Sequence, residues 1–132
     1  MKKPAKKVEL EAAIKQVYSD ICQAFAELDF DTVLEYFADE GMVKISQGRL
    51  LRGKRELAQS WRQRLAGVAE LRIRMENVRV QEVDGHHAWS TADEYISVNG
   101  EERQAIVSNI FVLQESGWKI LLDHTTYVEQ ET

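Results

Sequence analysis

The sequence predicts an α+β fold in which a curved antiparallel sheet wraps around a long N-terminal helix, with two further helices. Apolar residues recur at spacings of three and four over about residues 8–28, which is typical of one amphipathic helix. In the C-terminal half the apolar period becomes two, and the hairpin signals Asp84-Gly85, Asn99-Gly100 and Ser116-Gly117 divide this region into a meander of four strands. A bulge predicted near Glu76-Asn77 would bend the first of these strands, and a bent sheet over a helix encloses a cavity.

Shorter elements are predicted between the long helix and the meander. Asp31 is placed to cap a short second helix that ends before Gly41. Residues 42–46 have the pattern of a short strand, and Gln47-Gly48 that of a turn into a second one. A third helix is predicted over about residues 53–65. The predicted order is therefore α-α-β-β-α-β-β-β-β.

Length and composition favour one domain over residues 1–132. The net charge of −5 and pI near 5.2 argue against a nucleic-acid partner, and the lysines near the N-terminus are expected to form a flexible basic tail over residues 1–7. The sequence contains no apolar run of membrane-spanning length, and the lone Cys22 fits a reducing compartment. We therefore expect a cytoplasmic protein without a membrane partner.

The last strand carries the side chains that organise the predicted site. Its alternation places apolar residues, His124 and a threonine on one face. A two-residue turn at Ser116-Gly117 would put Phe111 opposite Leu122 and Asn109 opposite His124. The imidazole of His124 would then point into the cavity, where it would be the best available general acid or base, or else a core histidine bonded to Asn109.

The neighbouring hairpin adds a hydroxyl to this row. If Asn99-Gly100 is a two-residue turn, Ser90 lies opposite Asn109. A three-residue turn would slip the register by one and substitute Thr91. Either register places a hydroxyl, an amide and the imidazole of His124 beneath the long helix.

Glu94 shares the predicted inner face. A carboxylate directed inward needs a partner or solvent, since its pKa otherwise rises, and Arg103 and Tyr18 are candidate partners. The alternative is a hydrated, inert carboxylate at the mouth of the cavity. We therefore assign His124, Asn109 and Glu94 as the candidate catalytic residues.

Ligand contacts are assigned to side chains of the same face and of the helices that cover it. Tyr18 and Trp61 lie at helical spacings, where such residues more often serve the core. His86 and His87 follow a hairpin turn and have no further ligand at a metal-binding spacing. Without a phosphate-cradling loop or a metal cluster, no cofactor is predicted. The assigned ligand contacts are Ser90, Tyr18, Trp61, Phe111 and Leu122.

The opposite face of the predicted sheet is apolar as well. The three predicted helices cannot cover both faces of the sheet, so this surface predicts a homodimer formed through the outer face. The residues concerned are Trp89, Tyr95, Ile106, Ile110 and Val112.

Two segments resemble a known family. Leu28-Asp29-Phe30-Asp31-Thr32-Val33-Leu34-Glu35-Tyr36-Phe37-Ala38-Asp39-Glu40 is similar to its GDLDALLALFADD pattern, and Gly117-Trp118-Lys119-Ile120 through Asp123-His124 is similar to its GWKIVHDH ending. With Arg52-Gly53 before the third helix and residues 85–89 entering a strand, the chain resembles the SnoaL-like group of the nuclear transport factor two-like superfamily. The resemblance spans nearly the whole chain.

This resemblance implies a cystatin-like cone with a deep pocket and, usually, a dimer. Members include ketosteroid isomerases, polyketide cyclases, limonene epoxide hydrolase, dehydratases and non-catalytic association domains. The isomerase chemistry does not carry over residue by residue. Ile21 stands where the isomerases have a tyrosine, Ile45 where they have the general-base aspartate, and Asn109 where they have a neutral aspartic acid.

Two function hypotheses follow. In the first, the chain is an enzyme that acts on a small, mostly apolar molecule by acid/base chemistry at His124, of the isomerase, cyclase, dehydratase or hydrolase type. In the second, the same fold serves as a non-catalytic ligand-binding or oligomerisation module. The family favours the first hypothesis, and the departures at the isomerase positions favour the second.

Overall fold

The structure is a computed structural model, and it describes residues 3–129. Its elements follow the predicted order, and the six strands form one sheet in the order β2-β1-β6-β5-β4-β3. The predicted fold class is confirmed. The elements are α1 (Lys3–Ala26), α2 (Phe30–Leu34), β1 (Val43–Ser46), β2 (Arg49–Arg52), α3 (Gly53–Arg64), β3 (Leu71–Asp84), β4 (His87–Val98), β5 (Glu101–Gln114) and β6 (Gly117–Tyr127).

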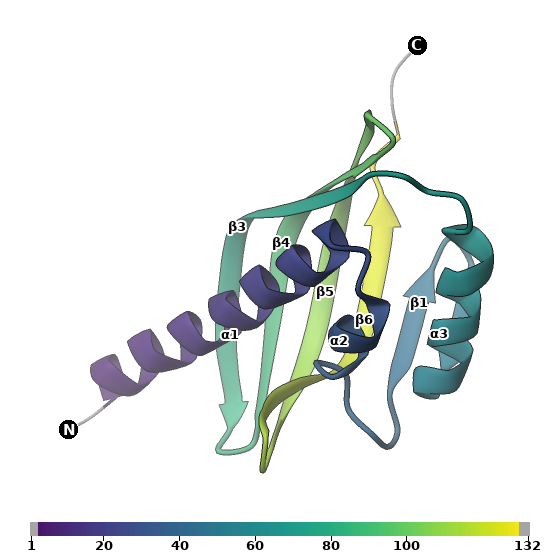
Figure 1. The fold of residues 1–132 in the computed structure, drawn as a ribbon. Coiled ribbons are helices and arrows are strands. Elements are labelled where there is room, and N and C mark those ends of the chain that lie inside the picture. The colour runs from purple at the N-terminus through teal and green to yellow at the C-terminus, as the bar shows by residue number, and fades with distance from the viewer. Residues whose placement is uncertain (1–2, 130–132) are drawn as a thin grey trace.

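The sheet is curved, and the helices lie on its concave side (Figure 1). α1 crosses β3, β4 and β5, α2 lies in front of β6, and α3 lies beside β1. The four long strands form the predicted antiparallel meander, whereas β1 pairs with β6 in parallel, so the sheet is mixed. Helices on one side of a curved sheet leave room for a hollow between the two layers.

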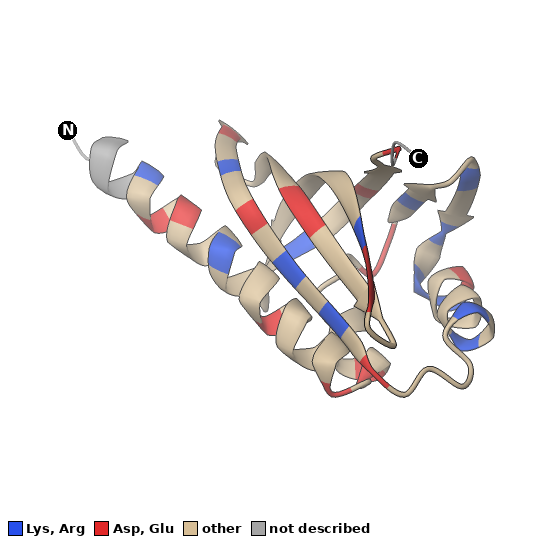
Figure 2. Cartoon of the chain, turned by 90° about the horizontal axis from the view of Figure 1, so that it is seen from above, with Lys and Arg blue, Asp and Glu red and all other residues tan. Residues whose placement is uncertain are grey.

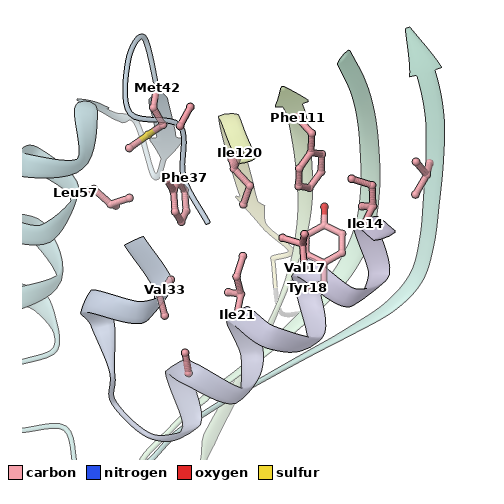
Figure 3. Packing of buried hydrophobic residues seen from close by; sticks show 13 residues of the cluster. Ile14, Val17, Tyr18, Ile21, Val33, Phe37, Met42, Leu57, Phe111 and Ile120 are labelled. Atoms are coloured by element: carbon pink, nitrogen blue, oxygen red, sulfur yellow. The ribbon is translucent and has the colours of Figure 1, made fainter. Parts of the chain in front are cut away.

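The long helix buries one stripe against the sheet. Ile14, Tyr18 and Ile21 lie at helical spacing and point toward Phe111 of β5 and Ile120 of β6 (Figure 3). All five side chains are at most 5% exposed. Burying a side chain of this size stabilises the fold by roughly 1.5–3 kcal/mol, so this stripe holds α1 in place.

The start of α1 and the capping residue of α2 differ from the prediction. α1 begins at Lys3, so the part of the predicted tail that the structure describes is helical, while residues 1–2 lie outside the described residues. The cap of α2 is Asp29, not Asp31, because the Asp29 carboxylate accepts hydrogen bonds from the backbone N–H and the hydroxyl of Thr32.

Bulges bend two of the long strands. The bulge predicted at Glu76-Asn77 is present, and Asn77 adopts a φ of 54° where the β3–β4 register shifts. A second bulge was not predicted. It falls in β6, where Ile110 pairs with Leu122 but Phe111 pairs with Ile120, so Leu121 has no partner on β5.

This second bulge overturns the predicted orientation of His124. Asn109 lies opposite Asp123, and His124 lies opposite Ser108 on the outer face, where it is exposed. Leu122 also points outward, because its partner Ile110 is an outer-face residue. A one-residue shift moves every later side chain of a strand to the other face, and this shift carried the imidazole out of the cavity.

The edge strand β3 carries mixed charges. Acidic and basic positions are interspersed along the strands (Figure 2), and Arg74 of β3 forms ion pairs with Glu76 and Glu102. Charged side chains and a bulge on an edge strand oppose pairing with a further strand. No helix among the described residues is long and apolar enough to cross a membrane.

Candidate functional site

A cavity of about 560 Å³ lies between the concave face of the sheet and the helices. Apolar and polar side chains both line it, with Phe25, Phe37 and Trp61 in edge-to-face contact on the helical side. Polar side chains reach it mainly from the strands. The polar and charged lining residues are Tyr18, Lys44, Ser46, Arg64, Glu94, Asn99, Glu101, Arg103, Asn109, Asp123, Thr125 and Tyr127.

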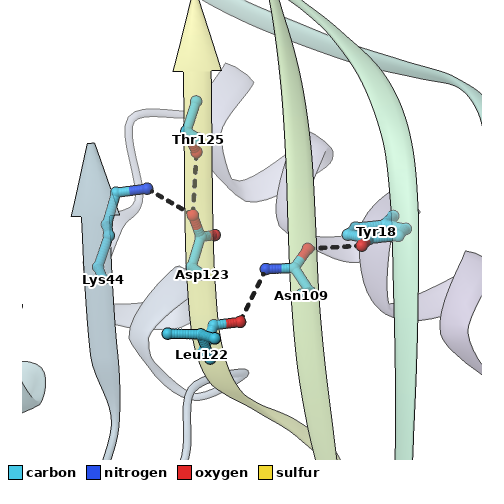
Figure 4. Close-up of polar contacts among 6 residues, drawn as sticks. All are labelled: Tyr18, Lys44, Asn109, Leu122, Asp123 and Thr125. Atoms are coloured by element: carbon cyan, nitrogen blue, oxygen red, sulfur yellow. Dashed lines mark hydrogen bonds and ion pairs between the residues drawn. The ribbon is translucent and has the colours of Figure 1, made fainter. Parts of the chain in front are cut away.

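A chain of buried hydrogen bonds closes the deep end of the cavity. The Tyr18 hydroxyl donates to Asn109 Oδ1 at 2.5 Å, and Asn109 Nδ2 donates to the carbonyl oxygen of Leu122 at 3.3 Å (Figure 4). Tyr18 has one proton, so Ser90 must be the donor in its 2.5 Å contact with Tyr18. Burial raises the pKa of Tyr18 far above its ordinary value. Tyr18 therefore stays neutral and orients the Asn109 amide.

Next to this chain lies a partly buried ion pair. Lys44 Nζ donates to Asp123 Oδ1 at 2.9 Å, and Thr125 Oγ1 donates to the same oxygen at 3.0 Å (Figure 4). The side chains of Lys44 and Asp123 are only 17% and 11% exposed. Burial disfavours the charged ammonium, but the ion pair and its hydrogen bond outweigh burial and raise the pKa of Lys44. Both donors use Oδ1, so no described side chain donates to Asp123 Oδ2.

Glu94 faces the same cavity without such a partner. In register it lies between Met75 of β3 and Ala105 of β5, and no side chain among residues 7–129 bonds to its carboxylate. Burial, and secondarily the negative charge of Asp123, raise the pKa of Glu94 from 4.5 to about 7, although Lys44 opposes the change. The cavity therefore holds two carboxyl groups in unequal environments.

Unlike Lys44, the two arginines at the mouth of the cavity, Arg64 and Arg103, form no ion pair with a described carboxylate. The guanidinium of Arg103 lies 4.2 Å from the centre of the Tyr127 ring, and it does not form the ion pair with Glu94 that the sequence suggested. Arg64, at the end of α3, donates to Gln47 at 2.6 Å. Glu101 is the carboxylate of the described rim, and it forms no ion pair with either arginine.

The predicted site residues divide into three groups. Tyr18, Trp61, Glu94 and Asn109 line the cavity, and the predicted pairing of Ser90 with Asn109 is present. Ser90 is fully buried behind Tyr18. Phe111 is also fully buried and belongs to the core instead of the lining, while Leu122 and His124 lie on the outer face. The structure thus contradicts the predicted convergence of Ser90, Asn109 and His124.

Two charged residues of the site, Lys44 and Asp123, were not identified from the sequence. Lys44 alternates with Val43 and Ile45, a pattern that suggests an exposed lysine, yet Lys44 points inward and both apolar neighbours point outward. The predicted alternation of the last strand implied an outward Asp123, by the same one-residue error that placed His124 inside. No local signal joins the pair, because parallel pairing of β1 with β6 brings together residues 79 positions apart.

Few side chains of the described cavity are suited to bind a metal ion. Among the described residues no group of three or more His, Cys, Asp or Glu side chains is arranged to hold one. The oxygens of Glu94 and Asp123 are the acidic donors within the cavity, and Asp123 is already bound to Lys44. The donor set favours hydrogen bonding and proton transfer to an organic molecule.

Comparison with known proteins assigns the family. A family model described as the SnoaL-like domain matches residues 14–128, from the middle of α1 to just beyond β6. The chain belongs to this family. The resemblance found in the two sequence motifs is therefore confirmed. No curated protein matches the sequence.

Solved structures share the fold of this SnoaL-like domain. A candidate dehydratase of the NTF2-like family from Streptomyces avermitilis is 23% identical, with a TM-score of 0.80, over 96% of this chain and 99% of that chain. A candidate aromatic ring hydroxylase from Novosphingobium aromaticivorans is 17% identical, with a TM-score of 0.81, over 93% and 92%. A cystatin-like protein from Nostoc punctiforme is 16% identical, with a TM-score of 0.78, over 91% and 92%. At these identities the likeness shows the fold alone.

The geometry also revises the comparison with the isomerases. The resemblance aligned Ile21 with their helix-one tyrosine, but Tyr18, one turn earlier, is the residue that reaches Asn109. Ile45, aligned with their general base, faces outward, and Lys44 beside it lines the cavity. The SnoaL-like domain therefore has a tyrosine next to Asn109 and an ammonium group near the position aligned with the base.

Proposed function

We propose that the SnoaL-like domain binds a small, mostly apolar organic molecule in the cavity and transfers a proton to or from it through Glu94. The observation that carries the proposal is the inequality of the two carboxyl groups. Asp123 is paired with Lys44, whereas Glu94 has no partner among the side chains that the structure describes and has a pKa of about 7. Near pH 7 such a group exists in both forms, so it can accept a proton in one step and return it in another.

The other polar groups have supporting roles in this proposal. One Lys44 proton goes to Asp123, which leaves further donors of the ammonium for an oxygen atom of the bound molecule. An ammonium fixed in a partly buried site stabilises negative charge that develops on such an oxygen. Asp123 positions Lys44, and Tyr18 positions Asn109, whose amide lines the cavity. The chemistry supported best is therefore proton transfer at a carbon next to a carbonyl group.

Replacement of Glu94 tests this role without knowledge of the natural substrate. We expect the native protein to accelerate exchange of the α-protons of 2-tetralone, an apolar ketone, for deuterium in D₂O at pH 7, because Glu94 can act as general base. In Glu94→Gln the acceleration over buffer should fall by about 100-fold or more. The measurement is the loss of the α-proton signals in one-dimensional ¹H NMR.

Glu82→Gln is the matched control, because Glu82 is an exposed carboxylate of β3 outside the cavity. It should leave the exchange rate unchanged. A native rate equal to that of buffer, or an equal rate in Glu94→Gln, would reject the proton-transfer role. Tight binding of 2-tetralone without exchange would favour the non-catalytic binding module instead.

We further propose that two copies of the domain associate through the outer face of the sheet. Four side chains form one apolar row across neighbouring strands of this face: Trp89, Ile110, Leu122 and Val43. Trp89 is 43% exposed, and Ile106, on the same face four residues before Ile110 along β5, is 48% exposed. Large, partly exposed apolar side chains that share one face are typical of an interface between identical subunits.

A charge placed in this row should separate the copies. We expect the native protein to sediment as a dimer and Ile110→Asp as a monomer, with the dissociation constant raised by about 100-fold or more, because each dimer would bury two unpaired carboxylates. Analytical ultracentrifugation measures the change. Val83→Asp is the control, since Val83 is 59% exposed near the β3–β4 turn and lies off the row. A native monomer at all concentrations would contradict the proposal.

A further inference from the structure

We propose that the mouth of the cavity is an anion-binding subsite, in which Arg103 holds the carboxylate of an organic acid whose apolar body fills the cavity. The proposal rests on the proposed function for the position of the body and extends it to the class of ligand. Arg103 lines the cavity, and no side chain among residues 7–129 forms an ion pair or a hydrogen bond with its guanidinium.

A second arginine of the sheet, Arg74, shows that a guanidinium stacked on a tyrosine ring can also form ion pairs. Arg74 lies 4.1 Å from the centre of the Tyr95 ring, nearly the same stacking geometry as Arg103 on Tyr127. The donors of Arg74 are taken up by Glu76 at its Nε and by Glu102 at 2.8 Å. At the cavity mouth the stacked guanidinium is held in place by Tyr127, and its donors remain for a ligand.

The inner rows of the sheet place this guanidinium relative to Glu94. Arg103 pairs with Ile96, and Glu94 pairs with Ala105, two residues further along β5. Two residues along a strand span about 7 Å, so a ligand group at Arg103 and a reactive carbon at Glu94 are separated by roughly that length.

Charge decides the orientation of the ligand. The interior contains the carboxyl groups of Glu94 and Asp123, which disfavour a full anion there, and the charge of the Lys44 ammonium is already balanced by Asp123, so its remaining donors suit a neutral carbonyl oxygen. The described rim carries two guanidinium groups, on Arg64 and Arg103, against the one carboxylate of Glu101. An organic acid therefore enters with its apolar body first and leaves its carboxylate at Arg103.

Two ligands of nearly the same shape test the subsite: 2-naphthylacetate and its uncharged amide, 2-naphthylacetamide. Calorimetric titrations are made at pH 6 and low salt, where an ordinary carboxylic acid is ionised. We expect the native protein to bind the acid about tenfold more tightly than the amide, as for one charge-assisted hydrogen bond to a guanidinium. In Arg103→Met the preference should disappear, with the affinity for the amide kept.

Arg79→Met is the matched control, because Arg79 is an exposed arginine on the outer side of β3 and does not line the cavity. It should keep the native preference for the acid. Equal binding of acid and amide by the native protein, or a preference that survives in Arg103→Met, would overturn the proposal, as would binding of neither compound. The titrations do not depend on turnover, so a loss of this subsite is distinguishable from a failure of Glu94 to exchange protons of 2-tetralone.

Discussion

Replacing Asp123 by alanine is expected to lower the free energy of unfolding by about 3 kcal/mol at pH 7. The substitution leaves the ammonium of Lys44 in a site where its side chain is only 17% exposed, without the carboxylate that stabilises its charge. It also removes the acceptor of the Thr125 hydroxyl. Removing one partner of such a pair is more harmful than removing both, because the remaining charge stays desolvated. Urea denaturation followed by circular dichroism measures the change.

Two further variants show whether the unpaired charge is the cause. Asp39→Ala removes a Lys–Asp pair on the surface, where the side chains of Lys54 and Asp39 are 30% and 76% exposed, and should change stability far less than Asp123→Ala does. The double variant Lys44→Met/Asp123→Leu should recover most of the stability lost in Asp123→Ala. Equal effects of Asp123→Ala and Asp39→Ala would show that the pair in the cavity is energetically an ordinary surface pair.

Asp123 faces the cavity because the register of the β5–β6 hairpin differs from the predicted one. The turn of the last hairpin was predicted one residue too late, because β5 ends at Gln114 and pairs this residue with Gly117. That error shifts the pairing by two residues and keeps each side chain on its predicted face, so Ile120 faces inward as expected. The bulge at Leu121 shifts the pairing back by one residue, which leaves a net error of one residue and reverses the faces of the rest of β6.

The hairpin between β4 and β5 was predictable because its turn is unambiguous. Asn99 and Gly100 adopt φ values of 51° and 87°, the conformation that this residue pair favours in two-residue turns. Ser90 consequently lies opposite Asn109, as predicted. The bulge in β6 has no such signature, since Leu121 lies in a continuous apolar run and the parallel strand β1 pairs from Leu122 onward. The local pattern of β6 therefore did not predict the bulge.

Alternation alone predicted that Glu94 lies on the inner face of the sheet, where the structure has it, and its environment leads to the second large effect. Its pKa is raised in the folded protein from 4.5 to about 7, so the folded state retains a proton there that the unfolded chain has released. Stability due to this group is therefore highest at or below pH 4.5 and falls as the pH rises to about 7. At about 1.4 kcal/mol for each pKa unit, the full loss is about 3 kcal/mol.

Glu94→Gln should remove this loss, because an amide of the same shape does not titrate. We expect the variant to match the native protein near pH 4.5 and to be more stable by about 3 kcal/mol at pH 8, where native Glu94 is ionised. Urea denaturation across this pH range measures the difference, and the exposed Glu82→Gln serves as control. Parallel pH profiles of the native protein and Glu94→Gln would contradict the raised pKa.

The sign of this effect ties stability to the proposed chemistry. A carboxyl group that served only the fold would be expected to stabilise the protein at its working pH, as a salt-bridged carboxylate does. Glu94 instead destabilises the fold when ionised, because its position in the cavity provides it with no partner among the described residues. Gain of stability together with loss of proton exchange in the same variant is the pattern expected of a residue retained for activity, while gain of stability with native exchange would leave Glu94 without a role in the reaction.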